Sequence, residues 1–293
     1  MNKLGIFMNF WEKTWDADHI KYVNKVADIG FDILEFQAQA LLDMSKERMC
    51  EIRSAAEGRG IELTYSLGLD QKYDISALDE SVRLGGIEYL KRIVERVSFM
   101  GGRVISGVSY AGWGIPEGMT DDKSAFWENS VNSMKKVLKT AEDFGVTYCV
   151  EAVNRFEGVL INTAEDALNY VKEFDSKNIG VLLDTYHMNI EENSIGDAIR
   201  LVGDRLYAVH TGENNRTPPG RGHLNWDEIF SALAEIGFKG QIVSEPFVMM
   251  GGEVGAAIHT WRNLVSDTTE AGLDKEAKAL LDFERNMILK YAG

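Results

Sequence analysis

The sequence predicts an α/β protein, a single (β/α)8 barrel with an added C-terminal helix. The first observation is a repeating pattern, in which a short apolar run is followed by a loop and then by an amphipathic helical segment. Eight such runs occur within 293 residues, a length that suits one barrel. The second observation is that most runs are apolar without strict alternation, as in parallel strands covered on both faces. A doubly wound open sheet is the alternative architecture.

The eight apolar runs are the expected strands. Each is short, and a loop and a helical pattern separate it from the next. In chain order they span residues 4–9, 31–37, 61–66, 103–107, 147–153, 179–184, 206–210 and 241–245.

The expected helices lie between these runs, where apolar residues recur every three or four positions. Gly101 and Gly145 follow two of them, at the place where a left-handed residue commonly ends a helix. Asn225 is the expected N-cap of a helix that Gly237 closes. We expect residues 267–293 to form the added terminal helix within the same domain. The expected packing positions are Ile87, Leu90, Val94, Val97 and Met100 on one helix, Met134, Val137, Leu138, Ala141 and Phe144 on another, and Leu280, Leu281, Phe283 and Met287 on the last.

Composition and charge exclude several classes of protein. The chain is 45% hydrophobic and 26% charged, which is ordinary for a globular protein. No uncharged apolar run approaches about 18 residues, so we expect no membrane span, and Glu12 and Lys13 argue against a signal peptide. Cys50 and Cys149 are too few for a disulfide framework, which favours a cytoplasmic protein with reduced thiols. A net charge of −15 would repel nucleic acid, so we expect no nucleic-acid partner.

Four metal-capable side chains stand at the ends of consecutive strands. In a barrel, reactive groups gather at the carboxyl ends of the strands. The fifth to eighth expected strands carry Glu151, Asp184, His210 and Glu245 there. Successive members are about one βα unit apart, so a barrel would make them neighbours around one mouth.

This set of side chains predicts a metal site. A single carboxylate at a strand end is more often a helix cap or a surface group than a ligand. Several carboxylates crowded at one mouth would repel one another, and a divalent cation removes that repulsion. Three carboxylates and one imidazole form a donor set for an ion that prefers oxygen ligands, such as Mn²⁺ or Mg²⁺. A zinc site of the thiolate-rich type would need cysteines instead. We expect one divalent ion per subunit, Mn²⁺ first, with Co²⁺ or Mg²⁺ as alternatives.

The segments at these strand ends resemble a known family. They read Glu151-Ala-Val-Asn-Arg-Phe-Glu157, Asp184-Thr-Tyr-His-Met-Asn-Ile-Glu-Glu192, His210-Thr-Gly-Glu-Asn-Asn-Arg216 and Ser244-Glu-Pro-Phe247. Together with the opening Met1-Asn-Lys-Leu-Gly-Ile-Phe7, Trp11 and Trp15, they closely resemble the ketose 3-epimerases, which include the D-tagatose and D-allulose (D-psicose) 3-epimerases. That family falls within the xylose-isomerase-like TIM barrel superfamily. The resemblance spans essentially the whole chain.

The resemblance implies a role for each candidate site residue. The implied metal ligands are Glu151, Asp184, His210 and Glu245, and Glu151 and Glu245 are also the implied acid/base pair. Three residues are implied to hold the O1–O2 end of the sugar: Glu157, His187 and Arg216. Four aromatic residues are implied to form the apolar pocket: Phe7, Trp15, Trp113 and Phe247. The resemblance also implies a homodimer or a homotetramer.

The implied reaction is metal-dependent epimerisation at C3 of free ketoses, such as D-fructose/D-allulose or D-tagatose/D-sorbose. Removing the proton next to the C2 carbonyl gives a cis-enediolate, which a metal chelated by O2 and O3 stabilises. Returning a proton from the other face requires a second carboxyl group. Gly251 and Gly252 before a helix resemble a phosphate site, but Glu253 would repel a phosphate, which favours a free sugar. The preferred ketose stays open.

Other functions remain as alternatives. The nearest is an aldose–ketose isomerase on a similar barrel, which would move a hydrogen between C1 and C2. A sugar-binding protein without turnover would use Glu151 and Glu245 as ligands only. A barrel endonuclease would need a histidine-rich mouth and a basic face, and the five histidines and the net charge of −15 argue against it. Taken without the resemblance, Trp15 and Trp113 suit the core equally well, and His187 and Arg216 suit a loop.

Overall fold

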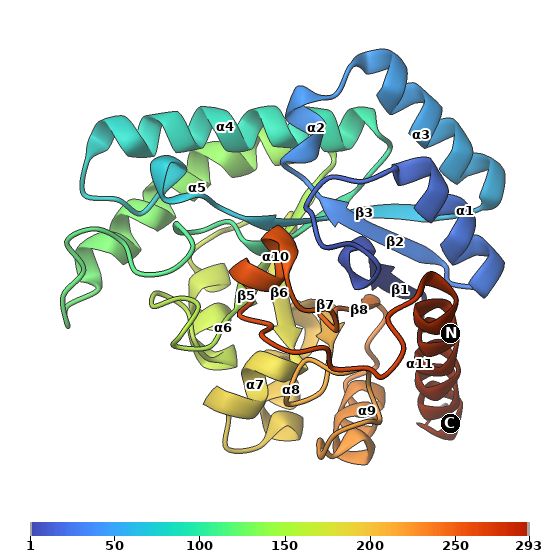
Figure 1. The fold of residues 1–293 in the computed structure, drawn as a ribbon. Helices are drawn as coiled ribbons and strands as arrows, with labels where there is room; N and C mark the ends of the chain where they lie inside the picture. Colours follow the sequence, from blue (N-terminus) through green and yellow to red (C-terminus); the bar gives the residue numbers. More distant parts are fainter. Residues whose placement is uncertain (1, 292–293) are drawn as a thin grey trace.

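The structure, a computed structural model that describes residues 2–291, confirms the expected barrel. Eight parallel strands pair in sequence order, and β1 closes the ring against β8 (Figure 1). The strands are β1 (Leu4–Phe7), β2 (Ile33–Gln37), β3 (Glu62–Gly68), β4 (Val104–Val108), β5 (Thr147–Ala152), β6 (Ile179–Asp184), β7 (Leu206–Thr211) and β8 (Gln241–Ser244).

Helices surround the barrel, and the last one follows β8 as the sequence predicts (Figure 1). Three short 3-10 turns accompany them: Met8–Phe10, Gln71–Tyr73 and Gly203–Arg205. The helices are α1 (His19–Ile29), α2 (Ala40–Asp43), α3 (Lys46–Arg59), α4 (Glu80–Phe99), α5 (Ser124–Phe144), α6 (Ala164–Lys172), α7 (Thr185–Glu191), α8 (Ile195–Val202), α9 (Trp226–Glu235), α10 (Gly252–Ala257) and α11 (Glu270–Tyr291).

Two strand ends differ from expectation in ways that matter for the site. β1 stops at Phe7, and the residues after it turn into a 3-10 helix, whereas the sequence suggests a strand to residue 9. Met8 and Phe10 are fully buried in that turn, so their apolar character does not distinguish a turn from a strand. β8 stops one residue before Glu245, but the Glu245 amide donates a hydrogen bond to the Thr211 carbonyl at 2.9 Å. That bond holds Glu245 beside the end of β7.

Helix ends follow the expected capping rules. The Asn225 side chain accepts a hydrogen bond from the Glu228 amide and starts α9, as predicted. Gly145 ends α5 in the left-handed region, at φ 64°. Thr163 and Asp166 form a capping box at the start of α6, in which each side chain accepts a hydrogen bond from the other's backbone amide. The caps at Thr163 and Asn225 fix where two loops of the barrel mouth end and their helices begin.

The core lies between the strands and the helices, and α11 completes it. The expected face of α4 is buried, whereas Phe144 at the end of α5 is 41% exposed. Leu280 and Leu281 of α11 are buried, and α11 packs against α9 and α1. Glu284 of α11 is also fully buried and accepts hydrogen bonds from two hydroxyl groups, Thr211 Oγ1 at 2.5 Å and Ser244 Oγ at 2.9 Å. Burial raises the pKa of Glu284 to about 7 despite these bonds.

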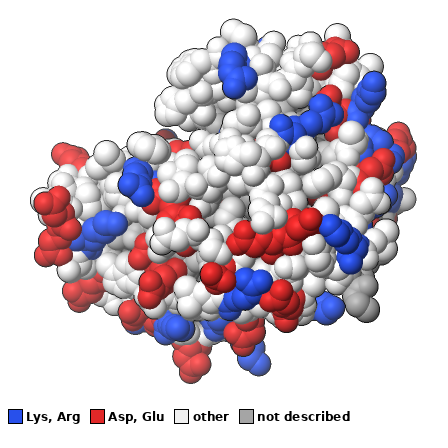
Figure 2. All heavy atoms as spheres, turned by 90° about the horizontal axis from the view of Figure 1, so that it is seen from below, with Lys and Arg blue, Asp and Glu red and all other residues white. Residues whose placement is uncertain are grey.

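The surface carries mixed charge. On the face drawn in Figure 2, acidic and basic side chains are interspersed, and the described residues form no continuous basic surface there. Within residues 2–291, no helix combines the length and the apolarity that crossing a membrane requires.

Candidate metal centre and active site

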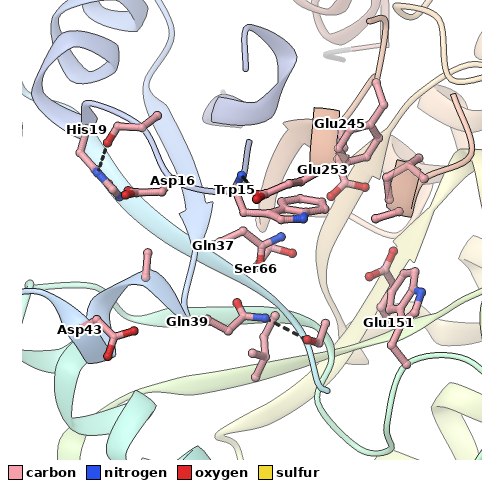
Figure 3. Close-up of a pocket in the computed structure, with 18 of the residues that line it drawn as sticks. Trp15, Asp16, His19, Gln37, Gln39, Asp43, Ser66, Glu151, Glu245 and Glu253 are labelled. Carbon is pink, nitrogen blue, oxygen red and sulfur yellow. Dashed lines mark hydrogen bonds between the residues drawn. The ribbon is translucent and has the colours of Figure 1, made fainter. Parts of the chain in front are cut away.

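The structure brings the four predicted donors together at the barrel mouth. Each of Glu151, Asp184, His210 and Glu245 is buried and offers one ligand atom, and these atoms all lie within 4.8 Å of one another. The strand register explains the convergence, because Asp184 of β6 stands directly beside His210 of β7. Glu151 and Glu245 project into the same cavity (Figure 3).

The donors suit a divalent cation. Asp184 Oδ2 and His210 Nδ1 are buried without a hydrogen-bond partner among the described residues. Burial raises the pKa of Asp184 to about 6 against the opposing effect of Arg216 and His210. Burial, together with the nearby Glu245 and Asp184 carboxylates, also raises the pKa of Glu151 well above its ordinary value. A cation would satisfy the unpaired atoms and relieve the cost of gathering these charges.

Asp184 has two separate tasks. Its Oδ1 caps α7, accepting hydrogen bonds from the amides of Tyr186 at 2.6 Å and His187 at 3.3 Å. Its Oδ2 faces the donor cluster, with Arg216 Nη1 at 3.7 Å. The same side chain therefore starts the helix that carries His187 and contributes a charge to the cluster.

His210 contacts a buried carboxylate that the sequence does not predict as part of the site. Glu35 of β2 is fully buried, and its Oε1 lies 3.0 Å from His210 Nε2. Thr64 and Ser106 donate hydrogen bonds to Glu35 Oε2 at 3.0 and 3.1 Å. A proton on Nε2 facing Glu35 leaves the Nδ1 lone pair free for a metal, and Nδ1 lies 3.7 Å from Glu245 Oε2. Burial lowers the pKa of His210, but Glu35 and Glu245 outweigh that effect and raise it.

His187 is neutral and its tautomer is fixed. The backbone amide of Asn154 donates to His187 Nδ1 at 3.1 Å, so Nδ1 accepts and Nε2 bears the proton. His187 lines the cavity, and its Nε2 lies 3.6 Å from Glu151 Oε1 and 3.4 Å from Arg216 Nη2. Burial, reinforced by the positive charge of Arg216, lowers the pKa of His187 well below its ordinary value.

Arg216 links the donor cluster to the neighbouring polar groups. Its Nη1 lies 3.3 Å from Glu245 Oε2, and its Nη2 lies 3.5 Å from Glu157 Oε2. The guanidinium stacks 3.9 Å above the ring of Tyr186. Arg216 adopts a left-handed backbone, at φ 65°, which is uncommon outside glycine and is found where a side chain must be aimed.

The aromatic candidates flank the cavity unequally. Trp15, Trp113 and Phe247 line it directly. Phe7 is buried behind Phe247, with ring centroids 5.8 Å apart and the planes near perpendicular. Glu157 likewise lies behind the lining, where it accepts a hydrogen bond from Asn154 Nδ2 at 3.0 Å. Phe7 and Glu157 therefore support cavity residues.

The sequence does not predict a role for three residues that lie near the donors: Glu35, Asn154 and Tyr186. Asn154 and Tyr186 lie inside the quoted motifs, but nothing in their spacing indicates that one would bind His187 or that the other would stack on Arg216. Glu35 offers one signal, since it is a carboxylate that stands between the apolar residues Leu34 and Phe36 of β2. A charge in a buried strand needs a partner, and that partner is His210.

Comparison with known proteins agrees with this architecture. The family model for the xylose isomerase-like TIM barrel matches residues 23–268. The D-psicose 3-epimerase of Ruminiclostridium cellulolyticum is 44% identical over 286 residues, which cover 98% of each chain. The D-psicose 3-epimerase of Agrobacterium fabrum is 38% identical, over 97% of this chain and 98% of its own.

Among solved structures, the D-psicose 3-epimerase of Clostridium cellulolyticum H10 with D-tagatose superimposes with a TM-score of 0.95. It shares 44% identity and covers 98% of this chain and 99% of its own. An L-ribulose 3-epimerase superimposes with a TM-score of 0.89 at 31% identity, over 99% of this chain and 96% of its own. The chain therefore belongs to the xylose isomerase-like TIM barrel family and, within it, is an isomerase of the ketose 3-epimerase group.

Proposed function

We propose that this enzyme inverts C3 of free ketoses with the help of one divalent cation. The observation that carries the proposal is the buried cluster of Glu151, Asp184, His210 and Glu245, in which the two glutamates both reach one cavity. A cation held by these residues would supply positive charge that acidifies the C3–H bond.

Glu151 and Glu245 act as the acid/base pair. They come from β5 and from the end of β8, and Figure 3 draws them facing across the cavity. One carboxylate removes the C3 proton, and the other carboxyl group delivers a proton to the opposite face of the enediolate. Inversion then needs no rotation of the substrate within the site.

The remaining residues hold the sugar. Arg216 and the Nε2–H of His187 donate hydrogen bonds to the oxygens on C1 and C2, and Glu157 keeps Arg216 in place. Trp15, Trp113 and Phe247 provide apolar walls and, with Phe7 behind them, exclude water from the reacting carbon. Glu253 also lines the cavity, and its charge favours a free sugar over a sugar phosphate.

The decisive experiment measures where deuterium from the solvent enters the product. Enzyme loaded with Mn²⁺ is incubated with D-fructose in deuterated water, and the products are analysed by NMR. We expect D-allulose with deuterium at C3. An aldose product, with or without deuterium at C2, would instead identify an aldose–ketose isomerase. No turnover of any common ketose by metal-loaded protein would contradict the proposal.

Two variants separate catalysis from simple binding. Glu151→Gln and Glu245→Gln each remove a titratable group, and we expect turnover to fall by about a hundredfold to ten-thousandfold. Bound metal is measured in the same samples by mass spectrometry. A variant that keeps both its metal and its full turnover would contradict the acid/base assignment.

The proposal includes Mn²⁺ as the preferred ion, a homodimer or homotetramer as the assembly, and the cytoplasm as the compartment. The oxygen-rich donor set supports Mn²⁺, with Co²⁺ or Mg²⁺ as substitutes. Metal analysis of the purified enzyme tests the ion, and light scattering tests the assembly.

A further inference from the structure

The cavity above the metal centre extends well beyond the reacting carbons. Its volume is about 790 Å³, near the upper end of the roughly 300–1,000 Å³ typical of sites for drug-sized ligands, and a single hexose is much smaller than such a ligand. Figure 3 shows Glu151 and Glu245 at one end and Asp16 and Asp43 at the other, with Trp15 and the polar side chains of β2 and β3 between them. The far end is therefore open to a second group.

We define the outer compartment by six of the lining residues, one from the loop before α1 and five from the segment that runs from the end of β2 into the first turn of α3. These are Asp16, Gln39, Ala40, Asp43, Met44 and Arg48. None of them belongs to the donor cluster, and they come from the opposite side of the barrel to β5–β8.

The position of the outer compartment fixes which end of a ketose would reach it. Glu157, His187 and Arg216 gather at the β5–β7 side, where the proposed function places C1 and C2. The rest of the sugar chain must then run towards β2 and β3, where Gln37 and Ser66 line the cavity. The outer compartment begins beyond these two residues, so it faces the C6 end of the substrate.

The outer compartment contains hydrogen-bonding groups that the protein itself leaves unused. Gln39 Nε2 donates to the Gly68 carbonyl at 2.9 Å, which fixes the side chain, while its Oε1 is buried without a partner among the described residues. Gln37 Oε1, at the entrance, is unpartnered in the same way. Both oxygens are shielded from solvent, so a sugar hydroxyl group would bind them after the amide group rotates towards the cavity. Met44 adds apolar surface of the sort that packs against a sugar ring.

The charges in the outer compartment select against a phosphate. Asp16 and Asp43 are acidic, and the one basic residue, Arg48, is already paired with Asp18 at 3.0 Å and Glu51 at 2.9 Å. An anion would therefore meet uncompensated carboxylates, whereas an uncharged sugar would not.

From this geometry we propose that the enzyme also epimerises ketoses that carry a neutral sugar unit on the C6 oxygen. The inference rests on the proposed function, because the same C3–H bond breaks and re-forms on the opposite face. The glycosidic bond is untouched, and no further reactant is needed. The second sugar occupies the outer compartment.

The test uses 6-O-glucosyl-D-fructose, whose C2 and C3 are free, in deuterated water beside D-fructose. We expect 6-O-glucosyl-D-allulose labelled at C3, with kcat/KM within about tenfold of the value for D-fructose, because one neutral group changes such ratios by that order. Turnover of D-fructose without turnover of the glucoside would overturn this inference alone, whether or not the glucoside inhibits. Loss of turnover on both sugars would overturn the proposed function.

Two further substrates and a pair of variants sharpen the result. D-fructose 6-phosphate should react at least about tenfold less well than the glucoside, because its charge faces Asp16 and Asp43; the reverse order would overturn the choice of a neutral unit. 3-O-glucosyl-D-fructose, in which O3 is blocked, serves as the negative control.

Ala40→Trp fills the outer compartment and should lower kcat/KM for the glucoside about tenfold or more relative to D-fructose. Ser54→Trp, on the exposed side of α3, is the matched control and should leave this ratio as in the wild type. Equal ratios in both variants would place the second sugar elsewhere and overturn the assignment.

Discussion

Replacing Glu35 by glutamine tests whether the carboxylate behind His210 sets the affinity of the metal centre. The two side chains are fully buried, and their nearest atoms are 3.0 Å apart. Two full charges at that distance would interact by about 5–6 kcal/mol at an effective dielectric constant of about 20, which is an upper limit because a metal-bound imidazole is neutral. A contact between a neutral N–H group and a carboxylate contributes about 1.5–3 kcal/mol. We therefore expect Glu35→Gln to weaken metal binding about tenfold to a hundredfold.

The assay is calorimetric titration of metal-free protein with Mn²⁺. Glutamine retains the size of the side chain and one oxygen for Thr64 and Ser106, so the barrel should remain folded, and the melting temperature of the metal-free variant checks this. Glu51→Gln, an exposed change on α3, is the control and should bind Mn²⁺ as the wild type does. Wild-type affinity in a folded Glu35→Gln protein would refute the reasoning.

Three other changes give measurable outcomes. Glu284 has a pKa of about 7 when folded and 4.5 as the ordinary value, so its stabilising contribution is complete below pH 4.5 and is lost as the pH rises to about 7. Urea unfolding at several pH values should show the stability of the wild type, measured relative to Glu284→Gln, falling by about 3 kcal/mol across this range, and parallel profiles would contradict it. Thr163→Ala removes half of the α6 capping box and should cost about 1 kcal/mol, seen as a melting temperature lower by about 2–4 °C. Arg216→Lys loses the planar fork and the stacking on Tyr186, so kcat/KM for D-fructose should fall about tenfold to a hundredfold with no change in the circular dichroism spectrum.

Local patterns predict the barrel and the donor cluster because both depend on one repeated spacing. Asp184 and His210 are recognisable as neighbours because each ends a strand and about one βα unit separates them. The predicted end of β1 is wrong because apolar character does not depend on the backbone conformation there. Met8 and Phe10 would be buried in a strand as they are in the 3-10 helix, so their side chains do not distinguish the two. Phe144 fits the apolar period of α5 but occupies its last turn, where it is exposed.

The contacts that cross the barrel are beyond the reach of sequence spacing. Glu35 on β2 meets His210 on β7 only after the sheet has closed, and Thr64 and Ser106 reach Glu35 from the two strands that follow β2. Nothing within a few residues of Glu35 indicates these partners. The outer compartment is similar, because the short α2 lies far in sequence from the residues around the metal centre.

Asp184 both caps α7 and belongs to the donor cluster, so a substitution at this position changes two features at once. An engineer who alters this residue to change the preferred ion also disturbs the start of α7, and with it the imidazole of His187, which lines the cavity. Glu151 caps no helix, since α6 starts well downstream with its own cap at Thr163, but the proposed function makes Glu151 one of the acid/base pair. Libraries aimed at ion preference are therefore better seeded at the residues packed around the four donors, with Asp184 and the two glutamates held constant.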